Sequence, residues 1–87
     1  MMDENGLRQQ IIESLTKTAP DIDQNALDPG INFRDQFEVD SVDYLSFMLD
    51  LEKRLGIRIP EVDYPKLSSM RGCLAYLQPV LGERQEA

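Results

Sequence analysis

One serine lies between two acidic residues at the point where a long polar segment meets the strongest helical pattern of the chain. From Glu38 to Asp43 the sequence reads E-V-D-S-V-D, and an amphipathic helix is expected over residues 41–55. Asp40 or Ser41 is a favoured N-cap of that helix, and Asp43 can bond back to it as in a capping box. A negative charge also suits the positive end of the helix dipole. Capping alone accounts for these residues and leaves the chemistry of Ser41 open.

The residue inventory argues against catalysis by Ser41. The chain contains no histidine, so a serine hydrolase of the usual kind is excluded. There is no cysteine and histidine cluster for zinc and no glycine-rich phosphate loop. Residues 21–25 open like a calcium loop, but Ala26 and Asn32 stand where that loop requires glycine and glutamate. We therefore expect no enzyme activity and no metal site, and Ser41 is better placed to be modified than to attack.

Length and composition indicate one small domain. The 87 residues include a single cysteine, so no disulfide can stabilise the fold and a reducing compartment is expected. The first residues have neither the basic nor the apolar part of a signal peptide, and no apolar run is long enough to span a membrane. These features predict a cytoplasmic protein that does not enter a membrane.

The negative charge is concentrated in the first half of the chain. The formal net charge is −7; ten acidic and three basic residues lie in residues 1–45, while residues 46–87 hold six of each. Between residues 21 and 43 there are seven acidic residues and one basic residue, Arg34. Such a surface repels nucleic acid and steers basic protein partners, although acidic surfaces also simply keep small proteins soluble.

Apolar periodicity predicts an all-α fold of three main helices, a short third helix and a long loop. The helices are expected at about residues 4–18, 41–55 and 62–67, with a last helix that Ser68 or Ser69 caps. Pro79 should end the last helix near Leu77 or Gln78, which gives a core of about residues 4–78 and a flexible tail over 79–87. The loop between the first two helices spans about twenty residues, and such long loops are often functional.

Residues 33–77 resemble an acyl carrier protein. The likeness rests on F-R-D-Q-F at 33–37, D-S-V-D at 40–43, I-P at 59–60 and L-A-Y-L at 74–77, in the family's order and without gaps after the motif. It implies a four-helix bundle of acyl-carrier type. It also implies that Ser41, with Asp40, Val42 and Asp43 around it, carries a 4′-phosphopantetheine arm derived from coenzyme A. The thiol of the arm would hold acyl intermediates as thioesters.

The resemblance also suggests which residues meet partners and cargo. Val42 and Leu49 fall opposite the centre of the core stripe of the 41–55 helix, beside Ser41, and together with Glu38, Asp43 and Glu52 they are candidates for a docking surface. An acyl chain would be sheltered between this helix and the last one. The residues expected around it are Leu45, Met48, Leu67 and Leu74.

Two departures from the fatty-acid carriers bear on the partners. Glu38 replaces a usual glycine, and Lys53 reverses a charge where basic partner surfaces commonly dock. We therefore expect a monomeric carrier in a specialised fatty-acid, polyketide or lipid pathway. Its expected partners are a phosphopantetheinyl transferase and acyl-loading, condensing or acyl-transfer enzymes with basic docking surfaces, and not nucleic acid or a membrane. The alternative is an unmodified acidic four-helix interaction domain in which Asp40 and Asp43 are caps only.

Overall fold

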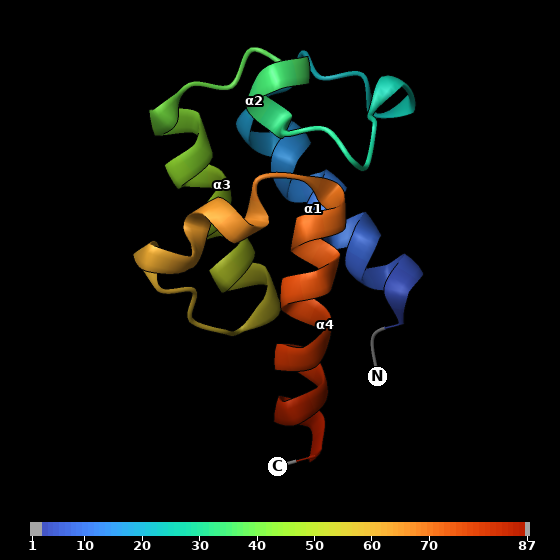
Figure 1. Ribbon diagram of the computed structural model, residues 1–87, viewed down its shortest axis with the longest axis vertical. Coiled ribbons are helices and arrows are strands. Elements are labelled where there is room, and N and C mark those ends of the chain that lie inside the picture. Colours follow the sequence, from blue (N-terminus) through green and yellow to red (C-terminus); the bar gives the residue numbers. More distant parts are fainter. Residues whose placement is uncertain (1–2, 87) are drawn as a thin grey trace.

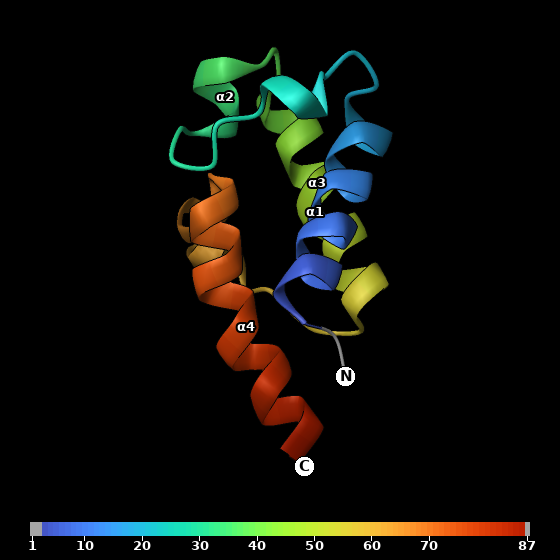
Figure 2. The same ribbon diagram turned by 90° about the vertical axis from the view of Figure 1, so that its right-hand side faces the viewer.

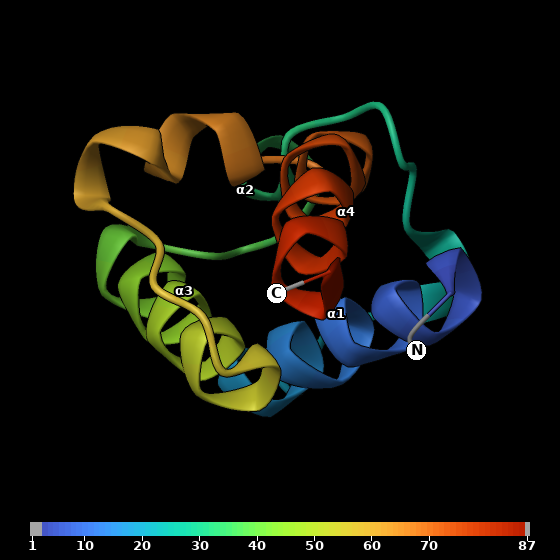
Figure 3. The ribbon, with the colours of Figure 1, turned by 90° about the horizontal axis from the view of Figure 1, so that it is seen from below.

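Three long helices pack around one apolar core, and short helical segments close it at one end. The computed structural model describes residues 3–86 (Figure 1). In chain order the elements are α1 (Glu4–Thr18), η1 (Gln24–Ala26), α2 (Phe33–Gln36), α3 (Ser41–Leu55), η2 (Glu61–Leu67) and α4 (Met70–Glu86), where η marks a 3-10 helix. Viewed along α4, the helices α1 and α3 lie on one side of it and η2 lies on another (Figure 3). The all-α fold with a short third helix is therefore confirmed.

Helix α1 begins and ends where the sequence predicts. The Asp3 carboxylate accepts a hydrogen bond from the Gly6 amide at 2.7 Å and so satisfies one of the unpaired donors of the first turn. Leu7, Ile11 and Leu15 recur on one face and are buried. This face packs against both α3 and α4, so α1 holds the two other long helices together.

Helix α3 runs from Ser41 to Leu55 and ends at Gly56, whose φ of 64° is a left-handed conformation that favours glycine. Its residues Phe47, Met48 and Leu51 are fully buried. Leu45, which was expected to line a sheltered acyl chain, is 45 % exposed. The reason is rotational, since at 100° per residue Leu45 falls on the side of Leu49 and away from Leu51.

Helix α4 continues to Glu86, so the expected end near Leu77 is wrong. Pro79 lies inside the helix and removes only the hydrogen bond that its amide would donate to the carbonyl of Ala75, an exposed residue that water can reach. Beyond the proline, Val80 and Leu81 are partly buried against the core, and this packing favours continuation of the helix. Figure 2 shows the second half of α4 leaning away from the direction of the first. None of the helices in residues 3–86 combines the length and apolar character needed to cross a membrane.

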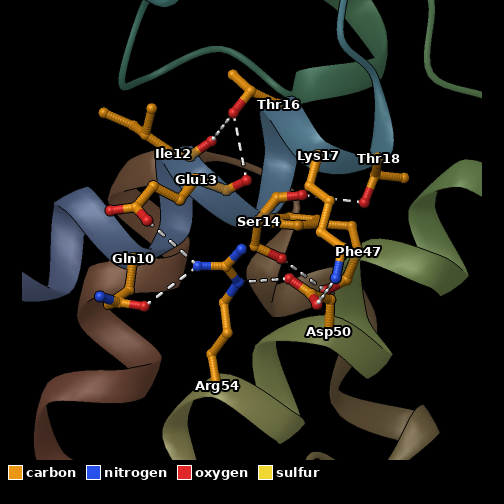
Figure 4. Close-up of polar contacts among 10 residues, drawn as sticks. All are labelled: Gln10, Ile12, Glu13, Ser14, Thr16, Lys17, Thr18, Phe47, Asp50 and Arg54. Atoms are coloured by element: carbon orange, nitrogen blue, oxygen red, sulfur yellow. Dashed lines mark hydrogen bonds and ion pairs between the residues drawn. The ribbon is translucent and has the colours of Figure 1, made fainter.

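A polar network joins α1 to α3 (Figure 4). The Asp50 carboxylate of α3 forms ion pairs with Nζ of Lys17 at 3.2 Å and with Nε of Arg54 at 2.6 Å. Arg54 also forms an ion pair with Glu13 of α1, with 3.5 Å between Nη1 and Oε1. The buried hydroxyl of Ser14 donates to the Phe47 carbonyl at 3.3 Å. Burial opposes ionisation of Asp50, but the hydrogen bonds, led by that from Arg54, outweigh it and lower its pKa to about 2. The network therefore fixes how α1 and α3 lie against each other, using charges that are paired.

Glycine is required where α4 meets the end of η2. A Cβ on Gly72 would lie 2.4 Å from the carbonyl oxygen of Lys66, closer than side-chain carbons approach. The Cys73 thiol, buried one residue further on, donates to the Leu67 carbonyl at 3.2 Å. Burial raises the pKa of Cys73, so this residue is a core thiol, as its position on the apolar stripe predicts.

Candidate functional site

Ser41 is the first residue of α3, and its side chain is exposed. The preceding residue, Asp40, is the N-cap: its Oδ1 accepts from the Asp43 amide at 2.8 Å, and the Asp43 carboxylate accepts from the Asp40 amide at 3.4 Å. The capping box predicted from the sequence is therefore confirmed. It fixes the backbone on both sides of Ser41 and leaves the hydroxyl without a structural task, because the two aspartates do the capping.

The loop that leads to Ser41 is anchored by a buried aromatic residue. Phe33 of α2 is fully buried, and its ring meets that of Phe47 edge-on with centroids 5.5 Å apart. Its amide donates to the carbonyl of Ser68 at 2.7 Å, which ties α2 to the segment before α4. Val39 is buried as well, at the last turn of the loop. Although the connection between α1 and α3 is long, its final part is thus held firmly.

A cleft of about 600 Å³ opens beside Ser41, between α2, α3 and η2. We call it the Ser41 cleft. It is lined by Asn32, Arg34, Ser41, Tyr44, Leu45, Glu61, Tyr64, Pro65 and Ser68. Among these residues, the sequence predicts a role in the site only for Ser41 and Leu45. No sequence signal indicates the residues of η2, because they reach the cleft only through the way η2 crosses α3.

Two of the residues that line the Ser41 cleft, Tyr44 and Tyr64, contact each other. The Tyr44 hydroxyl of α3 donates to the backbone carbonyl of Tyr64 in η2, and the two rings meet edge-on with centroids 6.4 Å apart. Burial raises the pKa of both phenols, so they remain neutral and Tyr44 remains a donor at neutral pH. A second hydrogen bond joins η2 to α4: the Tyr76 hydroxyl of α4 donates to the Asp63 carboxylate of η2 at 2.8 Å.

The outer face of α3 carries exposed apolar side chains next to Ser41. Val42 is 70 % exposed, Leu49 is 52 % exposed, and Leu45 lies between them along the helix. We call these three residues the outer face of α3. The placement of Val42 and Leu49 on the solvent side agrees with the periodicity argument, whereas Leu45 was missed. Single exposed apolar residues are ordinary, but three on one helical face form a continuous stripe.

The acidic residues proposed for docking differ in exposure and in their hydrogen bonds. Glu38 is exposed in the loop before the N-cap, and Asp43 is half-buried by the capping box. The Glu52 carboxylate accepts a hydrogen bond from the Ile59 amide at 3.2 Å, so it also holds the segment after α3. Lys53 is exposed near the far end of the helix. The charge along α3 therefore changes from acidic near Ser41 to basic at its C-terminal end.

The four candidates for an acyl pocket are divided between the core and the cleft. Met48 and Leu67 are fully buried and Leu74 is partly buried, so these three belong to the packed interior. Only Leu45 lines the Ser41 cleft. The open space in this structure lies between α3 and η2, and the predicted position between α3 and α4 is filled by side chains.

Comparison with known proteins bears directly on this site. The family model described as "Phosphopantetheine attachment site" matches residues 9–77. The chain belongs to the acyl carrier protein family. Acyl carrier proteins are carriers and not enzymes, their prosthetic group is 4′-phosphopantetheine, and they work with a phosphopantetheinyl transferase and acyl-handling enzymes.

Individual relatives agree with this membership. An acyl carrier protein of Lactobacillus johnsonii is 30% identical over 57 residues, which are 66% of this chain and 71% of the relative. One from Rubrobacter xylanophilus is 25% identical over 73 residues, covering 80% and 90% of the two chains. A meromycolate extension acyl carrier protein of Mycobacterium tuberculosis is 28% identical over 78 residues, covering 90% of this chain and 64% of the relative.

A solved structure supports the fold. The solution structure of a protein from Anaplasma phagocytophilum, provisionally described as an acyl carrier protein, superposes with a TM-score of 0.78 at 22% identity. The match covers 92% of this chain and 93% of the other. The arrangement of α1, α3, η2 and α4 is thus one that a carrier fold adopts.

The site fits the prosthetic group of the family. Attachment needs a hydroxyl that a transferase can reach and room beside it for a polar arm. Ser41 offers the first, and the open cleft with its mixed polar and apolar lining offers the second. When bound, the group supplies a thiol that holds an acyl chain as a thioester.

Proposed function

We propose that Ser41 is the residue to which 4′-phosphopantetheine is attached. The observation that carries this proposal is the exposed Ser41 side chain, which no hydrogen bond within the described residues engages, at the mouth of the cleft. The other serines fit less well. Ser14 is buried and bonded to a carbonyl, Ser69 caps α4 by accepting from the Gly72 amide at 3.0 Å, and Ser46 lies in the middle of α3 away from the cleft. Ser68 also lines the cleft, but it is half-buried and lies at the C-terminal end of η2 instead of at a helix start.

Attachment is a phosphoryl transfer in which this chain provides the nucleophile and the partner provides catalysis. Ser41 Oγ bonds to the phosphorus of coenzyme A that carries the pantetheine, the bond to the neighbouring phosphate breaks, and 3′,5′-ADP leaves. The hydroxyl proton passes to a base of the transferase, which supplies the catalytic groups. Asp40 and Asp43 contribute by holding the first turn of α3 in one conformation.

Intact-mass measurement tests the assignment. The wild-type chain, incubated with coenzyme A and a broad-specificity phosphopantetheinyl transferase, should gain the mass of one arm. Ser41→Ala should gain none, whereas the matched control Ser46→Ala, an exposed serine five residues along the same helix, should be modified at the wild-type rate. A wild-type chain that several transferases leave unmodified would instead support the unmodified acidic interaction domain.

The partners proposed for this carrier dock on α3 through basic surfaces. The outer face of α3 would supply apolar contact through Val42 and Leu49, and Glu38, Asp43 and Glu52 would supply the acidic charges. Exposed pairs of opposite charge mainly accelerate and select encounters. The chain would act as a monomer in the cytoplasm; for the location, the single cysteine, buried in the core, agrees with a reducing compartment.

The pathway proposed is a specialised one of fatty-acid, polyketide or lipid synthesis. Lys53 is the supporting residue, because an exposed cation at the end of α3 disfavours partners whose docking surface is basic throughout. An acyl chain entering beside Leu45 would have to part the packed side chains of Met48, Leu67 and Leu74 to reach the interior. Isolation of the modified protein from its own host, followed by identification of the thioester-bound acyl group by mass spectrometry, would identify both cargo and pathway.

A further inference from the structure

Arg34 is a cation in a strongly acidic part of the chain. It is the only basic residue between positions 21 and 43, among seven acidic ones. Within the described residues it forms no ion pair, whereas Lys17, Arg54 and Lys66 each pair with a carboxylate. A guanidinium surrounded by carboxylates in sequence, yet paired with none, is available for another anion.

The position of Arg34 is fixed by the backbone that leads to Ser41. Its Nε donates to the carbonyl of Val39 at 3.2 Å, two residues before the serine. In the described part of the chain, its two Nη groups take part in no hydrogen bond. Arg34 and Ser41 both line the Ser41 cleft, so the two residues border a common space.

The proposed modification creates an anion in that space. We propose that the guanidinium of Arg34 binds the phosphodiester that joins Ser41 to its arm, and thereby holds the start of the arm at the Ser41 cleft. This inference rests on attachment at Ser41. A phosphodiester on Ser41 adds a negative charge between Asp40 and Asp43, and the two carboxylates repel that charge. Arginine is suited to the task because its planar donors match phosphate oxygens and its charge does not depend on pH near neutrality.

The same side chain also borders a shallow hollow lined by Glu38, Asp40 and Asp43. These carboxylates compete with the phosphodiester for the guanidinium. The guanidinium therefore contacts either these carboxylates or the phosphodiester. The NMR signal of Arg34 changes on modification only in the second case.

The test uses the full chain in its unmodified and modified forms. Intact mass first establishes that Ser41 carries the arm; failure at this step contradicts the proposed attachment and not the role of Arg34. In ¹⁵N-labelled protein, we expect the Arg34 Nε–H signal to shift by more than its line width on modification. In the modified protein, Arg34→Gln should shift the ³¹P line of the phosphodiester, and Arg34→Lys should shift it less. The control Arg58→Gln, an exposed arginine outside the cleft, should leave it in place.

Salt provides an independent check. Raising the ionic strength from about 0.01 M to about 1 M shortens the Debye length from about 30 Å to about 3 Å. The ³¹P line of the wild type should then move toward that of Arg34→Gln. An Arg34 signal that is the same in both forms, together with ³¹P lines that coincide in the wild type, Arg34→Gln and Arg58→Gln, overturns the proposal while the attachment at Ser41 stands.

Discussion

The two ends of α3 use charge in opposite ways. In the second half of the helix, Asp50 and Arg54 are paired with each other and with α1, and their charges hold two helices together. At its start, Asp40 and Asp43 cap the helix, while Glu38 and Arg34 form no ion pair within the described residues. The charges of the second half stabilise the fold through their ion pairs, whereas charges that recognise a partner or a phosphate must remain available. The comparison predicts that changes at one end affect stability and changes at the other affect reactions.

The largest effect on stability is expected from Asp50→Ala. The side chain is only 14% exposed and receives both Lys17 and Arg54, so its loss leaves two cations without their main partner. We expect a loss of about 1–2 kcal/mol in the free energy of unfolding, measured by urea titration. The matched control at the other end, Asp35→Ala, removes an exposed carboxylate of α2 that forms no ion pair in the described part, and should change stability by less than about 0.5 kcal/mol. Equal losses of unfolding free energy in Asp50→Ala and Asp35→Ala would contradict the difference between the two ends.

For Leu49→Asp, on the outer face of α3, we expect little change in stability and a slower modification reaction. Leu49 is 52 % exposed, so helicity and unfolding should stay near the wild-type values. We expect kcat/KM for modification by a phosphopantetheinyl transferase to fall about tenfold, which corresponds to about 1.4 kcal/mol of lost transition-state binding. The control Ala75→Asp lies exposed on α4 and should react normally. Unfolding of the Leu49 variant would mean that the stripe belongs to the core.

A third expected effect is a dependence of stability on pH that comes from the Asp50 end. Hydrogen bonds, against the opposing effect of burial, lower the pKa of Asp50 from 3.8 to about 2, so the folded state binds this proton less readily than the unfolded chain. The contribution of Asp50 to stability is therefore present above the ordinary carboxyl pKa and is lost as the pH falls through about 2. The difference in unfolding free energy between the wild type and Asp50→Asn should shrink over this range. A difference that stays constant down to pH 2 would show that Asp50 titrates normally.

Local sequence predicts well wherever short-range contacts decide the structure. The bounds of α1 and α3, the capping box at Ser41 and the glycine end at Gly56 follow from apolar spacing and capping chemistry within a few residues. The same local logic failed at Pro79, because it takes no account of Val80 and Leu81, which pack against the core beyond the proline. It also misplaced Leu45, since periodicity gives the centre of a buried face more reliably than its edge.

By itself, the sequence determined the bounds of α1 and α3, the acidic character of the first half and the position of Ser41, the serine that we propose is modified. The tertiary structure alone decided that η2 crosses α3 to form the Ser41 cleft, that Asp50 and Arg54 bind α1, and that Arg34 turns toward the backbone before Ser41. The physical reason is the range of the interactions. Capping and periodicity act over one or two turns, whereas a cleft or an interhelical ion pair depends on residues distant in the chain that only packing brings together.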